Sequence, residues 1–137
     1  MTFALATIVI AAILPIVCAG LAKRHGFGVH PREGGYDNRS PREWLARQTG
    51  PSAWANAAQA NSWEALPLYA AAVIVNHMLG GAGLTTDILA GAFILLRIVY
   101  IAMYVSGRHA ARSVVWLAAW VVNLVIFFLP LGQALLP

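Results

Sequence analysis

Charged side chains are scarce in this sequence. They make up 10% of its 137 residues, whereas a soluble domain typically contains about 25%. This scarcity excludes a soluble core inside a charged shell. Because 60% of the residues are hydrophobic, the composition instead indicates an integral membrane protein that lies in a lipid bilayer.

Cysteine is also nearly absent, because Cys18 is the single one. One thiol cannot form an internal disulfide, and the four histidines are too scattered to complete a zinc site with it. We therefore expect neither a disulfide scaffold nor a metal site. The net charge of +4 comes from basic residues in two short segments between apolar runs, a distribution that sets membrane topology and argues against nucleic-acid binding.

Four apolar runs divide the chain, at about residues 2–22, 52–79, 87–105 and 113–136. A helix needs about 20 residues to cross the hydrocarbon of a bilayer, so the fold class expected is an all-α membrane protein, a four-transmembrane-helix bundle in a single domain over residues 1–137. In the first run the basic residues Lys23 and Arg24 follow the apolar stretch. A signal peptide has its basic residues in front, so we expect a retained anchor.

The basic residues predict the orientation. All nine except Arg97 lie in the segments 23–50 and 106–112. Short loops rich in lysine and arginine stay in the cytoplasm, so both loops are expected there and both termini on the opposite side. Within the first loop, Ser40 and Pro41 are typical of a helix start. Trp44, just after them, is then either an interfacial residue of a solvated loop or a contact for a ligand.

Polar side chains interrupt the second and third runs. On a helix, residues three apart share a face, so Asn61 lies beside Glu64, with Gln59 further round. In the third run the spacings of three, four and four residues place four side chains on one stripe. These are Arg97, Tyr100, Tyr104 and Arg108. Such groups are costly in lipid and are expected to face other helices or a wet crevice.

Simpler interpretations are available for these residues. Glu64 and Arg97 could pair only to hold two helices together, and the tyrosines could be interface anchors. Interface positions are also expected for Asn76 and His77, near the end of the second run. Trp116 and Trp120, one turn apart in the last run, are expected to pack or to join an aromatic belt.

Four motifs in order resemble the MAPEG family, the membrane-associated proteins of eicosanoid and glutathione metabolism. They are "YDNRSPR" at 36–42, "QANSWEALPLY" at 59–69, "RIVYIAMY" at 97–104 and "RHAARS" at 108–113. The resemblance extends over essentially the whole chain and is nearest to bacterial members. It implies a homotrimer in the bacterial inner (cytoplasmic) membrane, with glutathione bound as a co-substrate between neighbouring subunits, near the cytoplasmic side.

The resemblance also implies roles for individual residues. Asn61 and Glu64 match positions that hold the peptide, with Glu64 at its α-amino group, and Gln59 matches a nearby contact. Tyr100 and Tyr104 match tyrosines that line the site. The remaining candidates are arginines and one serine: Arg112 with Ser113 beside it at the thiolate, and Arg24, Arg39, Arg42 and Arg97 for the two carboxylates of glutathione.

Elementary chemistry agrees with these roles. A guanidinium lowers the pKa of a nearby thiol and so favours the nucleophilic thiolate, and arginine binds carboxylates in bidentate fashion. The function expected is a glutathione-dependent transferase or peroxidase, with an apolar electrophile or lipid hydroperoxide arriving from the bilayer. The alternative is a non-catalytic membrane protein that binds another anionic or lipid-like ligand, or a structural subunit of a complex. Many family members have a basic residue one turn before Asn61, whereas Ala57 and its neighbours are not basic, which favours this alternative.

Overall fold

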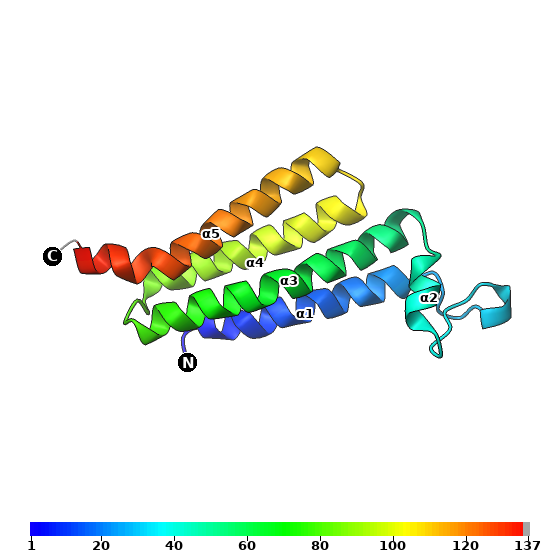
Figure 1. Ribbon diagram of the computed structural model, residues 1–137, viewed down its shortest axis with the longest axis horizontal. Helices are drawn as coiled ribbons and strands as arrows, with labels where there is room; N and C mark the ends of the chain where they lie inside the picture. The colour runs from blue at the N-terminus through cyan, green and yellow to red at the C-terminus, as the bar shows by residue number, and fades with distance from the viewer. Residues whose placement is uncertain (136–137) are drawn as a thin grey trace.

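Four long helices lie side by side along the chain's longest axis in the computed structural model, which describes residues 1–135 and the side chains of residues 1–132. In chain order the elements are α1 (Phe3–Lys23), the short 3-10 helix η1 (Pro31–Glu33), α2 (Pro41–Ala46), α3 (Gly50–Met78), α4 (Leu84–Val105) and α5 (His109–Leu135). Figure 1 shows η1 and α2 at one end of the bundle, beyond α1, and the α3–α4 turn at the other end.

Among the described residues, three helices are long and apolar enough to cross a membrane: α1, α4 and residues His109–Gly132 of α5. Large apolar side chains cover their outer faces, among them Ile16, Leu95 and Phe128, and on helices of this length and apolarity such a surface is typical of contact with lipid. The chain is therefore an all-helical integral membrane protein. The helix α3 is longer, at 29 residues, and falls outside this apolar class because of its polar side chains. The fourth crossing stays a prediction.

Two helix boundaries differ from those that hydropathy predicts. The helix α4 begins at Leu84 rather than at residue 87, and α5 begins at His109 rather than at 113. Only Ser106, Gly107 and Arg108 separate α4 from α5, because the sequence between His109 and Arg112 contains good helix formers that hydropathy alone does not recognise. The predicted end of the last span at residue 136 lies outside the described residues.

A stripe of small side chains packs α1 against α3. On α1 the buried positions recur every three or four residues and include Ala4, Ala11 and Ala22. Ala55 and Ala58 occupy the corresponding face of α3. Small residues allow two helix backbones to approach closely, which is the main source of helix association in lipid.

Buried polar residues tie the helices together at the end opposite α2. Asn76 is fully buried, donates from Nδ2 to the carbonyl of Ile126 at 2.8 Å and accepts from the Thr86 hydroxyl at 3.1 Å. The predicted interface position of Asn76 is therefore wrong, because α5 passes over it. His77 is half-buried and hydrogen bonds to the Thr2 hydroxyl at 2.6 Å. These bonds join α3 to each of the other long helices or their caps.

The first loop has a small aromatic core of its own. Trp44 is 3% exposed, and its indole N–H donates to the carbonyl of Gly34 at 3.0 Å. Its ring meets Tyr36 edge to face at 5.4 Å, and Tyr36 meets Phe27 in the same way at 5.6 Å. The predicted helix that starts at Pro41 is confirmed as α2, with Ser40 at its N-cap. The interpretation of Trp44 as an interfacial residue is wrong, because this tryptophan packs inside the loop.

Candidate functional site

A polar cleft of about 230 Å³ opens between α3, α4 and α5 at the end of the bundle where α4 turns into α5. Its wall contains five side chains that the sequence indicates as site candidates and one, Trp116, that the sequence assigns to packing or an aromatic belt. The lining residues are Asn61 from α3, Tyr100 and Tyr104 from α4, and Arg112, Ser113 and Trp116 from α5.

Two phenol rings form the α4 wall of the cleft. Tyr100 and Tyr104 are four residues apart, so they stack along one face of the helix. Their rings meet edge to face with centroids 5.6 Å apart and planes at 82°. Tyr100 is buried and Tyr104 is half-buried. The deeper ring therefore faces the bundle and the shallower ring lies nearer the mouth.

An arginine guanidinium lies over each of the two phenol rings. Arg97 lies over Tyr100 with its Cζ 4.5 Å from the ring centroid, and Arg112 lies over Tyr104 at 4.2 Å. Both distances are within the range of cation–π attraction, which strengthens as water is removed. One arginine comes from α4 and the other from α5, so the two rings fix the positions of two positive charges from different helices.

Arg97 is anchored deep in the bundle by α3. It is 3% exposed and donates to Asn61 Oδ1 at 3.0 Å and to Ser62 Oγ at 3.1 Å. Ser62 donates in turn to the backbone carbonyl of Ala58 at 2.8 Å. Sequence reasoning missed Ser62, although its place directly after Asn61 and two residues before Glu64 is a signal that could have found it.

Glu64 does not pair with Arg97. Glu64 is exposed on the outside of the single chain, and among the described side chains the one ion pair is that of Arg39 with Asp37. The interpretation of Glu64 and Arg97 as a clamp between two helices is therefore wrong within one chain. Gln59, which is half-buried, also lies outside the cleft lining.

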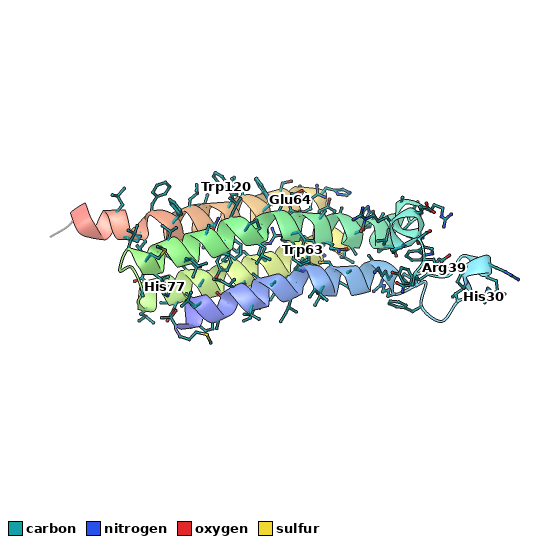
Figure 2. All side chains as sticks on the ribbon, turned by 60° about the horizontal axis from the view of Figure 1, so that its bottom comes forward. His30, Arg39, Trp63, Glu64, His77 and Trp120 are labelled. Carbon is teal, nitrogen blue, oxygen red and sulfur yellow. The ribbon has the colours of Figure 1, made fainter. Side chains whose placement is uncertain are left out.

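The loop arginines lie apart from the cleft wall. Arg24, Arg39 and Arg42 are all exposed, and Figure 2 shows Arg39 at the loop end of the molecule, while Glu64 lies between that end and His77. The Arg39 guanidinium binds both carboxylate oxygens of Asp37 at 3.1 Å. This contact holds the pKa of the Asp37 carboxyl below its usual value. Arg39 is thus already engaged by a carboxylate.

The α5 side of the cleft combines a cation, a hydroxyl and an indole. Arg112 is half-buried, and Ser113 is exposed with its hydroxyl donating to the His109 carbonyl at 3.3 Å. Trp116 follows Ser113 by three residues and continues the same wall. Its predicted role as a packing or belt residue is incomplete, because one side of it borders the cleft.

This arrangement can bind an anion and hold hydrogen-bonding groups out of lipid. Two guanidiniums offer several N–H donors each, the phenols both donate and accept, and the low-polarity surroundings strengthen each contact. Of the candidates from the sequence, the single chain thus brings Asn61, Tyr100, Tyr104, Arg112 and Ser113 into one cleft, with Arg97 behind them.

Comparisons with known proteins give one match. Neither a curated protein nor a solved structure matches the chain. The sequence pattern of the MAPEG family matches residues 3–132, which is nearly the whole chain. This match includes every helix that lines the cleft. The chain belongs to the MAPEG family, whose members include glutathione transferases and related enzymes.

Proposed function

We propose that the protein is a glutathione-dependent transferase or peroxidase that acts on apolar electrophiles or lipid hydroperoxides in the membrane. The observation that carries this proposal is Arg112, a half-buried guanidinium in the wall of a polar cleft within an otherwise apolar bundle. An ionisable side chain in such surroundings is by default a candidate for function, and we infer that the anion it stabilises is the thiolate of glutathione.

In the conjugation reaction the glutathione thiol loses its proton to solvent. The sulfur then forms a bond to the electrophilic carbon as the bond from that carbon to the leaving group breaks, and the leaving group departs with the electron pair. The role of Arg112 is to stabilise the thiolate, which is the nucleophilic form. Ser113 and Tyr104 border the same space and can donate hydrogen bonds to the sulfur. Tyr100, Asn61 and Arg97 form the floor that holds the peptide part of glutathione.

A second copy of the chain completes the site in this proposal. Glu64 and Gln59 lie outside the cleft of one chain, on α3, the helix whose crossing of the bilayer is still a prediction. A neighbouring subunit in a homotrimer would bring Glu64 to the α-amino group of glutathione bound between the two. The basic loops would then face the cytoplasm of a bacterial inner membrane, where glutathione is available, and Arg24, Arg39 and Arg42 would meet its carboxylates.

The test uses purified protein in lipid nanodiscs. Calorimetry measures glutathione binding, and a spectroscopic assay measures conjugation to a small model electrophile. We expect binding in the micromolar to millimolar range and turnover above the rate in empty nanodiscs. If calorimetry detects no binding up to millimolar glutathione, the proposed enzyme function is wrong.

The second candidate is a non-catalytic membrane protein that binds another anionic or lipid-like ligand, or supports a larger complex. Two observations favour it. The turn of α3 before Asn61 has Ala57 where many relatives have a basic residue, and Arg39 is already paired with Asp37. Both reduce the number of cations free to hold the glutathione carboxylates. Binding of an anionic lipid in the absence of any glutathione binding would select this candidate.

A further inference from the structure

A second polar hollow, of about 420 Å³, lies within the first loop. One of its walls comes from η1 and the residues just after it and includes Arg32 and Asp37. The other comes from α2 and the residues that follow it and includes Trp44, Arg47 and Gln48. This loop hollow shares no lining residue with the cleft between α3, α4 and α5. Its volume is in the range of about 300–1,000 Å³ that is usual for small-molecule sites.

Trp44 fixes the two walls of the loop hollow relative to each other. Its indole N–H donates to the Gly34 carbonyl at 3.0 Å, and the Gln48 side-chain amide donates to the Trp44 carbonyl at 3.0 Å. Gly35 is buried between the walls, and a Cβ at this position would collide with the carbonyl oxygen of Val29. The hollow is thus formed before any ligand arrives, which lowers the entropic cost of binding.

The charges in the walls of the loop hollow are unequal. Asp37 is bound by the Arg39 guanidinium, whereas Arg32 and Arg47 are exposed and have no carboxylate partner among the described side chains. The pKa of Asp37 lies below its usual value, mainly because Arg39 donates hydrogen bonds to it and to a smaller extent because of the charge of Arg47. Since Arg39 neutralises Asp37, Arg32 and Arg47 remain as two uncompensated positive charges.

These donors match a phosphate monoester better than a carboxylate. A phosphate monoester has three terminal oxygens and a charge of about −1.5 to −2 at neutral pH. Each guanidinium can bind two of these oxygens, and the Gln48 amide has a second N–H in addition to the one that Trp44 accepts. A carboxylate has a single charge and two oxygens, so it would leave one of the two arginines uncompensated.

The loop hollow opens outside the helix bundle. Figure 1 shows η1 and α2 beyond the end of α1, and Figure 2 shows His30, the residue before η1, at the outer tip of the loop. A ligand can therefore reach the hollow from water. We propose that the loop hollow is a binding site for the phosphate group of a phosphate monoester, which Arg32 and Arg47 hold from the two walls. This site is separate from the glutathione cleft and does not rest on the function proposed above.

The experiment compares two ligands of the same shape and different charge, phenyl phosphate and phenyl sulfate. Calorimetry measures the binding of each to the protein in nanodiscs of neutral phosphatidylcholine, without glutathione. The sulfate ester has a single negative charge, so we expect phenyl phosphate to bind about tenfold more tightly. Equal affinity for the two esters overturns the proposal, and so does the absence of phenyl phosphate binding up to millimolar concentration.

Single variants assign the binding to the two arginines. Arg32→Ala and Arg47→Ala should each weaken phenyl phosphate binding by about tenfold, because each removes charge-assisted hydrogen bonds. Both side chains are exposed, so the helical circular dichroism and the thermal midpoint should stay those of wild type. Arg108→Ala is the matched control, since it removes one exposed positive charge outside the hollow and should bind phenyl phosphate as wild type does. An equal loss in all three variants would show unspecific attraction by net charge and contradict the proposal.

A further measurement identifies the source of the phosphate. Nanodiscs that contain phosphatidic acid present a phosphate monoester on a lipid. If this lipid displaces phenyl phosphate, the natural ligand is a lipid headgroup; if it does not, the ligand is a soluble ester, and the phosphate site stands in both cases. The site is also independent of conjugation, because the double variant of Arg32 and Arg47 should keep the kcat of wild type at saturating glutathione. Phenyl phosphate binding without glutathione binding would support this site and remove the enzyme function, and conjugation without phenyl phosphate binding would do the reverse.

Discussion

The Arg112 guanidinium lies 4.2 Å from the centre of the Tyr104 ring, so a cation on α5 rests on an aromatic face of α4. The contact crosses the tightest turn of the bundle, since only Ser106, Gly107 and Arg108 separate the two helices. The position of the charge in the cleft is thus set by a neighbouring helix as well as by its own.

Replacement of Arg112 by alanine should lower kcat/KM for glutathione conjugation by about 100-fold, the usual loss when one charge-stabilising donor is removed. Because the guanidinium favours the thiolate, its loss raises the pKa of the bound glutathione thiol, and the rate should rise with pH over a higher range than in wild type. Steady-state rates across a pH series measure both effects. Arg108→Ala is the control, because Arg108 is exposed and lies outside the cleft lining. An unchanged rate in Arg112→Ala removes the thiolate role.

Asn61 and Glu64 should differ in their contributions to stability, although they lie one turn apart on α3. Asn61→Leu leaves the buried Arg97 guanidinium without one acceptor, which should lower the free energy of unfolding by about 1–3 kcal/mol. Glu64→Gln removes no contact within the chain and should change it by less than about 0.5 kcal/mol. Denaturant unfolding in detergent monitored by circular dichroism compares the two. A large loss of unfolding free energy in the monomeric Glu64→Gln protein would mean that Glu64 does pair with Arg97.

Gly81 should not tolerate a side chain. A Cβ at this position would lie 2.8 Å from the Asn76 amide nitrogen and 2.8 Å from a ring carbon of Pro130. Overpacking of this kind costs about 1–3 kcal/mol, so Gly81→Ala should lower the thermal unfolding midpoint. Gly83→Ala is the matched control two residues away, since its Cβ meets no atom within 4 Å and its φ of 170° is extended. Equal midpoints for the two variants would mean that α3, α4 and α5 do not close around this turn.

Thiol labelling should resolve the orientation in the membrane. The native Cys18 is fully buried, so the labelling of an introduced cysteine can be measured above a low background from the native thiol. Val29→Cys in the first loop should react with a membrane-impermeant maleimide in inverted vesicles and not in intact spheroplasts. Leu84→Cys, at the opposite end of the bundle, should show the reverse. Both positions are exposed, at 42% and 76%. Reaction of Val29→Cys in spheroplasts would reverse the predicted topology.

Period and composition predict the parts of this molecule that depend on one helix at a time. Apolarity locates α1, α4 and α5, and the spacing of Arg97, Tyr100 and Tyr104 places them on one face of α4. The partner of Arg97 depends on how far α3 is rotated and shifted against α4. Helix period does not contain that information, so the sequence left Glu64 open as one possible partner and did not identify Asn61 and Ser62.

The same limit applies to buried residues whose partners are distant in sequence. From the sequence of α3 alone, Asn76 is expected at the membrane interface. In the structure α5 packs over Asn76, whose amide donates to the Ile126 carbonyl. From its own segment, Trp44 has the features of a surface anchor. In the structure the loop turns back at Gly34, whose φ of 91° favours glycine, and this turn brings the Gly34 carbonyl to the Trp44 indole. Trp116 looks like a packing residue on α5 alone. In each case the environment comes from a second segment, and a single sequence gives no measure of that contact.

The aromatic cluster of Phe27, Tyr36 and Trp44 has a consequence for how anions reach the protein. Lys23, at the end of α1, lies 4.8 Å from the centre of the Tyr36 ring, which attaches the cluster to the bundle. The cluster keeps the first loop ordered, and this loop contains the exposed Arg24, Arg39 and Arg42. The electrostatic field of these arginines therefore acts on approaching anions without a prior rearrangement of the loop. Charge changes in this loop should therefore alter the salt-dependent rate of ligand capture and leave the chemical step that we propose at Arg112 unchanged.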